Sequence, residues 1–166
     1  MVIVAVLTYM LTVQAERQRQ LVIGRQAEQL RDASIAVVSV ANQVGASLGA
    51  ADHIIRAMTL NGSADELETG RKRWNAADSV WIADKIGLAH VMERAVQSEA
   101  IDAAWSHMDS TVFALGEALT SAFVVLHRPK VDARLRTATL LVARRDTAQA
   151  ALERFLHVMQ PALAAR

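Results

Sequence analysis

The sequence predicts an all-α fold: an antiparallel up-down-up-down four-helix bundle with an extended N-terminal helix. Only seven Gly and two Pro interrupt the 166 residues, so few helix breakers are present. The apolar residues recur at helical rather than alternating spacing, and four such stretches follow one another with short connections. With 52% hydrophobic residues, the chain is long and apolar enough to bury a substantial core as one domain.

The first helix carries a seven-residue, coiled-coil-like repeat that forms one packing seam. We expect this helix to end at Asn61 and Gly62. Ser63 followed by Glu66 is a capping box, which predicts the start of the second helix. The seam consists of Ile23, Leu30, Val37, Val44, Ala51 and Met58, with a second row at Ala33, Val40, Ser47 and Ile54.

The second and third helices are separated by a change in the direction of the apolar face. Continuing the face of the second helix would place Glu99 and Asp102 in the core, so we predict a break near Gln97 with Ser98 as the next N-cap. The apolar face of the second helix is Trp74, Ala77, Trp81, Leu88, Met92 and Ala95. That of the third is Ile101, Trp105, Met108, Val112, Leu115, Leu119 and Phe123.

Proline marks the end of the third helix and disturbs the end of the fourth. Pro129 disfavours a helical conformation at Arg128, so the fourth helix should begin near Lys130, and Pro161 should fray or kink its end. The predicted apolar face of the fourth helix is Val131, Leu135, Ala138, Val142, Ala148, Leu152, Phe155, Met159 and Leu163.

The first helix is much longer than the other three, so its start should project from the bundle. We divide the chain into an N-terminal anchor or stalk, residues 1–26, and a bundle, residues 27–166. The apolar run 2–13 covers about 18 Å, too short to span a bilayer core of about 30 Å unaided. We expect membrane contact through this helix. The alternatives are a tail that packs against partner copies and a signal peptide cleaved after Ala15.

Arginines follow the apolar run, and no Lys or Arg precedes it. Arg17, Arg19, Arg25 and Arg31 therefore favour, by the positive-inside rule, an inner-membrane protein with its bundle on the cytoplasmic side. A periplasmic or extracellular bundle is the alternative.

The sequence lacks the motifs of readily recognised enzymes and metal sites. Without Cys there is no disulfide, thiolate metal site or thiol nucleophile. No His follows a Glu at the three-residue spacing of di-iron bundles, and no zinc-protease, serine-hydrolase or phosphate-loop motif occurs. His53, His90, His107 and His157 fall about 120° or more from their helices' core faces, so we expect no cofactor and no metal.

Polar residues interrupt two of the apolar faces near mid-bundle. Asp84 and Lys85 do so in the second helix, and Arg145 with Gln149 in the fourth. These four residues are the candidate polar core or ligand site, because charges in a core are tolerated mainly when paired. In the alternative reading, Lys85 and Arg145 extend to solvent from the edge of the face.

Charge is unevenly distributed along the bundle. Residues 62–127 hold five basic and ten acidic residues, net −5, whereas 128–166 hold eight basic and three acidic, net +5. The helices could pair internally, or the basic residues could dock an acidic partner or lipid head groups. Nucleic acid is not expected, because no aromatic residues are interleaved with them. The candidate partner or lipid face is Arg128, Lys130, Arg134, Arg136 and Arg144.

Two glycines four residues apart, Gly45 and Gly49, lie on one face of the first helix. We expect them to allow close packing against a large residue such as Trp74, Trp81 or Trp105. The functional alternative is a small cavity opposite the glycines.

The predicted layout resembles the ligand-sensing bundles of bacterial membrane receptors, although no motif accompanies the resemblance. We therefore expect a membrane-anchored, non-enzymatic interaction, scaffold or sensing module that binds a protein partner or further copies of itself. A cofactor- or ligand-binding bundle carrying haem, metal or a small molecule is the first alternative. An enzyme built on Asp84, Lys85 and Arg145 is the second.

Overall fold

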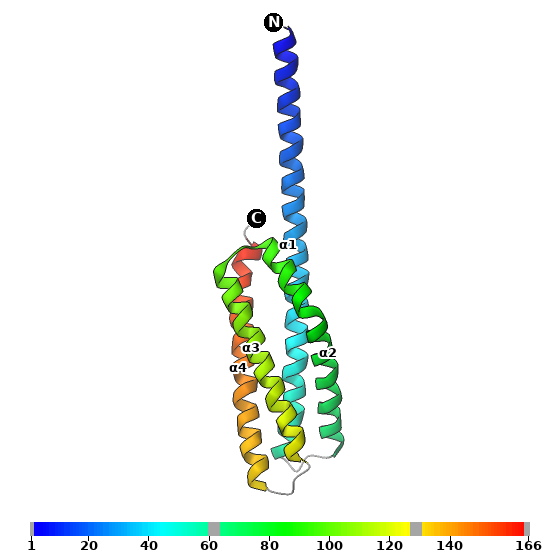
Figure 1. The fold of residues 1–166 in the computed structure, drawn as a ribbon, viewed down its shortest axis with the longest axis vertical. Coiled ribbons are helices and arrows are strands. Elements are labelled where there is room, and N and C mark those ends of the chain that lie inside the picture. The colour runs from blue at the N-terminus through cyan, green and yellow to red at the C-terminus, as the bar shows by residue number, and fades with distance from the viewer. Residues whose placement is uncertain (1, 60–63, 127–130, 165–166) are drawn as a thin grey trace.

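The structure, a computed structural model, describes residues 2–59, 64–126 and 131–164. Four helices account for nearly all of them and alternate in direction (Figure 1), so the predicted all-α four-helix bundle with a long first helix is confirmed. The helices are α1 (Val2–Thr59), α2 (Ala64–Ala95), α3 (Glu99–Leu126) and α4 (Val131–Ala164).

The boundary between α2 and α3 falls where the change of apolar face predicts it. The Ser98 carbonyl accepts hydrogen bonds from the backbone N–H groups of Ile101 and Asp102, both at 3.0 Å, which makes Ser98 the N-cap of α3. α4 continues through Pro161 to its end. The predicted breaks at Asn61–Gly62 and Pro129, and the Ser63 cap, lie outside the described residues.

The core follows the predicted faces of α1, α2 and α3. The seam of α1 is buried from Ala33 to Met58 except at Val37, which is partly buried, whereas Ile23 is 66% exposed because α1 joins the bundle only after that position. The largest fully buried side chains include Phe155, Ile54, Met92, Met108, Leu115, Leu119, Leu141 and Met159.

The predicted face of α4 is wrong at Leu135 and Val142. These residues are 51% and 39% exposed and Leu141 is fully buried instead, whereas Ala138 is buried as predicted. The buried Leu141 lies seven residues before the buried Ala148, and Arg145 lies between them. Because that position is charged, the apolar residues alone do not reveal the rotation of the helix, and a shift of one residue turns the face by 100°.

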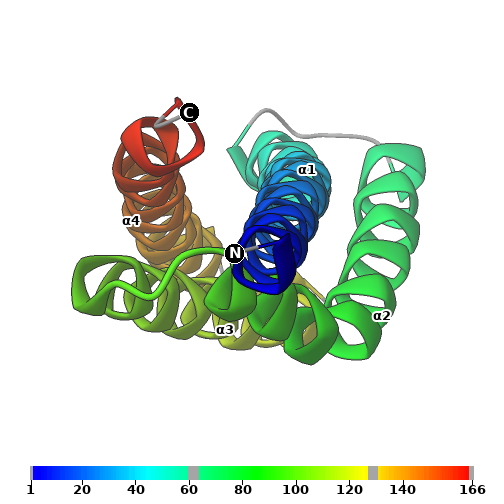
Figure 2. The ribbon, with the colours of Figure 1, turned by 90° about the horizontal axis from the view of Figure 1, so that it is seen from above.

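α1 lies between α2 and α4, with α3 across from it (Figure 2). The helix backbones approach each other extensively between α1 and α2, α3 and α4, and α1 and α4, at few positions between α2 and α3, and at none between α2 and α4. α1 and α2 approach closely at Gly70, where a Cβ atom would lie 2.8 Å from Ile54 Cγ1. The wide backbone separation of α2 and α3, which large side chains bridge, positions the site described below.

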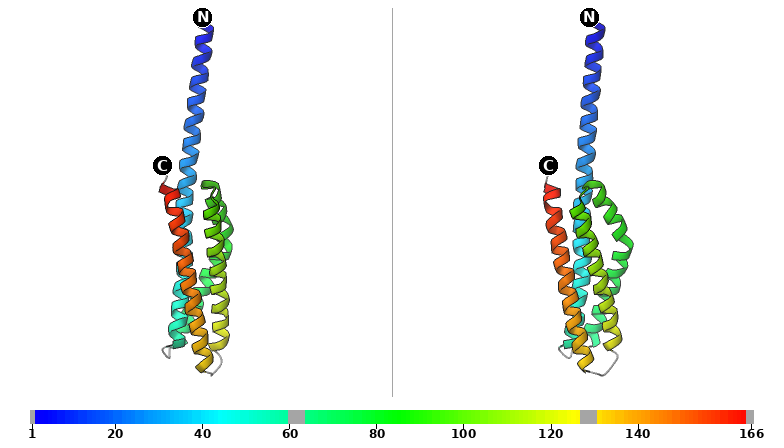
Figure 3. Two further views of the ribbon diagram at one scale, coloured as in Figure 1. Left: turned by 90° about the vertical axis from the view of Figure 1, so that its left-hand side faces the viewer. Right: turned by 60° about the vertical axis from the view of Figure 1, so that its left-hand side comes forward.

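α1 continues beyond the ends of the other helices as one unbroken rod (Figures 1 and 3). The side chains of residues 14–29 are all exposed, including Leu21, Val22 and Ile23. Two helical segments, Thr12–Thr59 and Glu99–Val125, are long and apolar enough to cross a membrane, although 39% and 33% of the relevant stretches are buried inside the bundle.

Candidate functional site

An open groove of about 600 Å³ runs between α2 and α3, where these helices separate. Apolar and aromatic side chains form most of its wall, and three carboxylates and one lysine stand around it. Its lining residues are Trp74, Asp78, Trp81, Ile82, Lys85, Asp109, Val112, Phe113, Gly116, Glu117, Thr120 and Ser121.

Two tryptophans of α2 form the floor of the groove. Trp74 and Trp81 are only 7% and 4% exposed. A Cβ atom at Gly116 would lie 2.9 Å from the Trp74 ring, so the glycine is what lets this indole lie against α3. The Trp81 ring is 5.7 Å from that of Trp105, which meets Phe155 edge-on at 5.8 Å. These ring contacts tie the floor to the core and make it rigid.

An ion pair between α2 and α3 stands in the groove wall. Lys85 Nζ donates to both carboxylate oxygens of Asp109, at 3.0 and 3.1 Å, and the Trp81 indole N–H donates to Asp109 Oδ1 at 3.2 Å. The Lys85 and Asp109 side chains are 32% and 31% exposed, so the pair is partly screened by solvent. Asp78 and Glu117 also line the groove, which therefore carries a net charge of −2.

Large apolar side chains stand exposed on both rims. Ile82 of α2 is 61% exposed and Phe113 of α3 is 66% exposed, and Ile86, one turn beyond Ile82, is 65% exposed. Exposed apolar residues that gather around a groove are typical of an interaction surface. The arrangement suits an apolar group flanked by positive charge.

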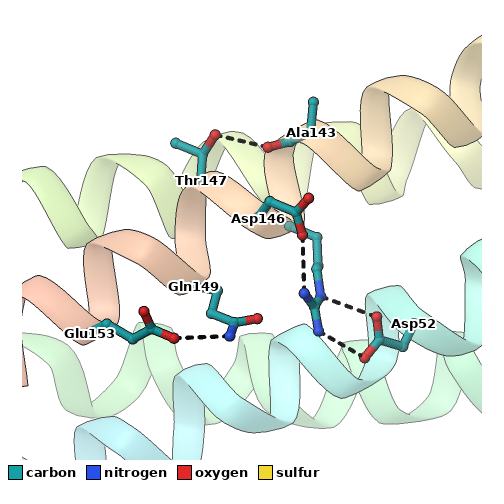
Figure 4. A network of polar contacts seen from close by, with 7 residues as sticks. Asp52, Ala143, Asp146, Thr147, Gln149 and Glu153 are labelled. Atoms are coloured by element: carbon teal, nitrogen blue, oxygen red, sulfur yellow. Dashed lines mark hydrogen bonds and ion pairs between the residues drawn. The ribbon is translucent and has the colours of Figure 1, made fainter.

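The four residues of the predicted polar layer do not meet in one place. Lys85 lies in the groove, whereas its neighbour Asp84 accepts a hydrogen bond from Gln43 of α1 at 3.0 Å. On α4, Gln149 donates to Glu153 at 2.9 Å and stands apart from the ion pairs of Arg145 (Figure 4). Adjacent helical residues point 100° apart, which is why Asp84 and Lys85 serve different helix contacts.

Arg145 joins α4 to α1 from the edge of the core. Its Nε lies 3.1 Å from Asp52 Oδ1, and its Nη1 lies 3.0 Å from Asp146 Oδ1 (Figure 4). The hydrogen bond to Asp146, together with the charge of Asp52, raises the pKa of Arg145 against the opposing effect of burial. A cation with a raised pKa stabilises the fold below its unfolded-state pKa, so this contribution is present at neutral pH.

The predicted basic face is not a single surface. Arg128 and Lys130 lie outside the described residues. Arg134 is half-buried, whereas Arg136 is exposed, and two positions along a helix turn the side chain by 200°. Arg136 and Arg144, eight residues apart, do share a side of α4 and are both exposed.

Gly45 and Gly49 do not pack against a tryptophan, contrary to expectation. No atom lies within 4 Å of a Cβ built at either glycine; the close tryptophan contact is at Gly116 instead. The two glycines border a shallow groove of about 580 Å³ on the outer side of α1 and α2, whose wall includes Ala76 and Val80. The two glycines face away from the packing seam of α1. The spacing of small residues alone did not reveal this orientation.

Within the part of the chain that the structure describes, no three His, Cys, Asp or Glu side chains are grouped to hold a metal ion. His53 lies 2.7 Å from Arg73 Nη1 and 3.2 Å from Arg56 Nη2, and His90 lies 3.4 Å from Glu93 Oε2. These histidines contact charged side chains at the surface.

Sequence reasoning missed Asp109, Phe113 and Gly116 as parts of a site. Phe113 offered a signal, because a large apolar residue on the polar side of a helix has no internal partner. In comparisons with known proteins, no family model, curated protein or solved structure matches the chain.

Proposed function

We propose that this protein is a membrane-anchored, non-enzymatic interaction module. The apolar run 2–13 would contact the membrane, and the bundle would offer the α2–α3 groove to a protein partner. The observation that carries the proposal is the continuity of α1, which takes the apolar run away from the bundle on a helix whose residues 14–29 are all exposed. A helix that projects in this way can present its apolar run to a membrane.

The chemistry of the groove favours binding over catalysis. Lys85 and Asp109 satisfy each other, and Trp81 takes part in the same hydrogen bonds, so these groups are held in place rather than poised for proton transfer. An apolar floor with exposed apolar rims and a few charges is the usual composition of a protein-binding surface.

The proposed orientation separates the anchor from the basic residues of α4. α4 begins at the end of the bundle opposite the projecting part of α1 (Figure 1), and its 34 residues span about 51 Å. Arg136 and Arg144 would therefore stand far from the lipid head groups around the anchor. This arrangement favours a protein partner, rather than lipid, for these arginines.

Flotation of the full chain with native membranes tests the anchor. The unsubstituted chain (the parent) should float with lipid. A double substitution in the apolar run, Val4→Lys with Leu7→Lys, should release the chain from the membrane, because burying charge in hydrocarbon is costly. Gln14→Lys with Gln18→Lys adds the same charge beyond the run and should leave flotation unchanged. A released parent would overturn the proposal.

The side of the membrane can be read from one introduced thiol, because the chain has no Cys. Ser110 is exposed on α3, so Ser110→Cys should be labelled by a membrane-impermeant maleimide only after lysis if the bundle is cytoplasmic. Labelling in intact spheroplasts would place the bundle on the periplasmic side.

A small-molecule ligand in the same groove is the second candidate function. The volume of about 600 Å³ lies in the usual range for such sites, and two indoles form the floor. Native mass spectrometry of the full chain in mild detergent separates the two candidates. A small added mass favours a ligand, and a mass of several chains or of a second protein favours a partner.

A further inference from the structure

We propose that the partner is a second copy of this chain, and that the α4 strip of one copy occupies the α2–α3 groove of the next. The α4 strip consists of Arg136, Leu140 and Arg144. The inference rests on the proposed function, because copies anchored in one membrane stand parallel and at the same height.

Charge complementarity identifies the partner. The groove wall carries a net charge of −2, and the α4 strip carries two exposed arginines and no carboxylate. Within one chain the strip does not reach the groove, because the groove lies between α2 and α3, and α4 lies on the other side of α1 from α2 (Figure 2). Arg145 of α4 pairs with Asp52 of α1 rather than with α2. Side-by-side copies would bring the arginines of one bundle against the groove carboxylates of the next.

The α4 strip also matches the groove in its pattern of apolar and charged groups. Arg136, Leu140 and Arg144 follow one another at four-residue spacing on one side of α4, and all three are exposed. Leu140, 48% exposed, would enter the groove over the Trp74 ring. The guanidinium groups on either side of Leu140 would then reach carboxylates of the groove, where Arg–carboxylate contacts are strong.

The two surfaces lie at the same level of the bundle. α3 ends at Leu126 and the antiparallel α4 begins at Val131, so equal steps from that end place Leu140 about level with Glu117. The contact of Trp74 with Gly116 puts this part of α2 at the same level. Parallel copies therefore need no shift along the membrane normal to bring strip and groove together.

The proposed contact is head-to-tail, because the strip and the groove are different surfaces. Repetition of such a contact generates rings or rows rather than isolated two-fold dimers. A cross-link between one position in the groove and one position beside the strip can therefore distinguish a head-to-tail contact from a two-fold dimer.

Cross-linking of two single-cysteine full-length chains in membranes tests the geometry. Ser121→Cys lies in the groove wall, and Ala143→Cys lies on the exposed side of α4 beside the strip. A short bismaleimide should join the two variants when they are co-expressed. Cross-linking of either variant expressed alone would indicate a two-fold contact and would overturn the proposal.

Charge reversal tests whether attraction between the α4 strip and the groove holds the two copies in the cross-linked arrangement. Placing Arg144→Glu in the Ala143→Cys chain, or Asp78→Arg in the Ser121→Cys chain, should lower the yield by about tenfold, because attraction becomes repulsion. Combining the two reversals should restore it. Arg94→Glu, the same reversal at an exposed residue of α2, is the matched control and should leave the yield unchanged.

Two further measurements keep the outcomes distinct. Unfolding followed by tryptophan fluorescence should show that each charge variant folds as the parent does. Absence of the mixed cross-link while the chain still floats with membranes overturns the second copy as partner and leaves the anchored bundle standing. A cross-link that survives both single reversals overturns the proposed pairing of strip and groove.

Discussion

Asp109 is the residue on which the polar end of the groove depends. It accepts hydrogen bonds from the Lys85 ammonium and from the Trp81 indole, both of α2. Removing its carboxylate would leave the buried indole N–H without its acceptor, whereas removing Lys85 leaves a carboxylate that water can reach. The two partners of this ion pair are therefore unequal in their effect on stability.

We expect Lys85→Met to change the free energy of unfolding by less than about 1 kcal/mol, because an ion pair about a third exposed is screened by solvent. Asp109→Ala should cost more, about 1–3 kcal/mol. Urea unfolding followed by tryptophan fluorescence measures both. A loss above about 2 kcal/mol for Lys85→Met would give the ion pair a structural importance that its exposure does not support.

Gly116 is the residue that makes room for the floor of the groove. We expect Gly116→Ala to destabilise the bundle by about 1–3 kcal/mol, since the new methyl group would lie 2.9 Å from the Trp74 ring. The emission of Trp74 should shift as the ring is displaced. Gly87→Ala is the matched control, because nothing lies within 4 Å of its Cβ. It should stabilise α2 by about 0.5–1 kcal/mol. If Gly116→Ala and Gly87→Ala changed the free energy of unfolding equally, the proposed contact of Gly116 with the Trp74 ring would be contradicted.

At the scale of helices, α1 serves two purposes in one element. Its lower half supplies the seam of the bundle, and the side chains of residues 14–29 in its projecting half are all exposed. A disturbance in the projecting half should therefore stay local, whereas the same disturbance in the lower half should reach the core.

Proline substitution at two exposed positions of α1 separates these halves. Arg19→Pro should leave the unfolding midpoint of the bundle unchanged, while Asn42→Pro should lower stability by about 3 kcal/mol or more. Both side chains are exposed, so neither change removes a core residue. All three tryptophans, Trp74, Trp81 and Trp105, lie in the bundle and report its unfolding. A lowered midpoint for Arg19→Pro would mean that the projecting half stabilises the bundle.

At the scale of the whole molecule, the α2–α3 groove carries a net charge of −2, and Arg136 and Arg144 are exposed on α4. These two charged surfaces belong to different helices and are separated across the bundle. A lateral asymmetry of this kind acts between molecules, where its range is set by ionic strength.

We expect the cross-link between copies to weaken as salt is raised. From about 0.01 M to about 1 M, the screening length falls from about 30 Å to about 3 Å, so the yield should drop severalfold. Flotation with membranes, which depends on apolar burial, should not fall and serves as the control. A yield that is constant or rises with salt would contradict a contact guided by charge.

The sequence by itself determined the helical class, the number of helices, the break at Ser98 and the seam of α1. These properties depend on local periodicity and capping, which involve residues a few positions apart. It failed at Leu135 and Val142, because the charged Arg145 at the edge of the core hides the rotation of α4.

Only the tertiary structure decided that α2 and α3 part to form a groove. It also decided that Lys85 meets Asp109 24 residues away and that Arg145 meets Asp52 93 residues away. Periodicity indicates which side of a helix is apolar. The distance and rotation between two helices depend on every residue packed between them, and no local pattern contains that information.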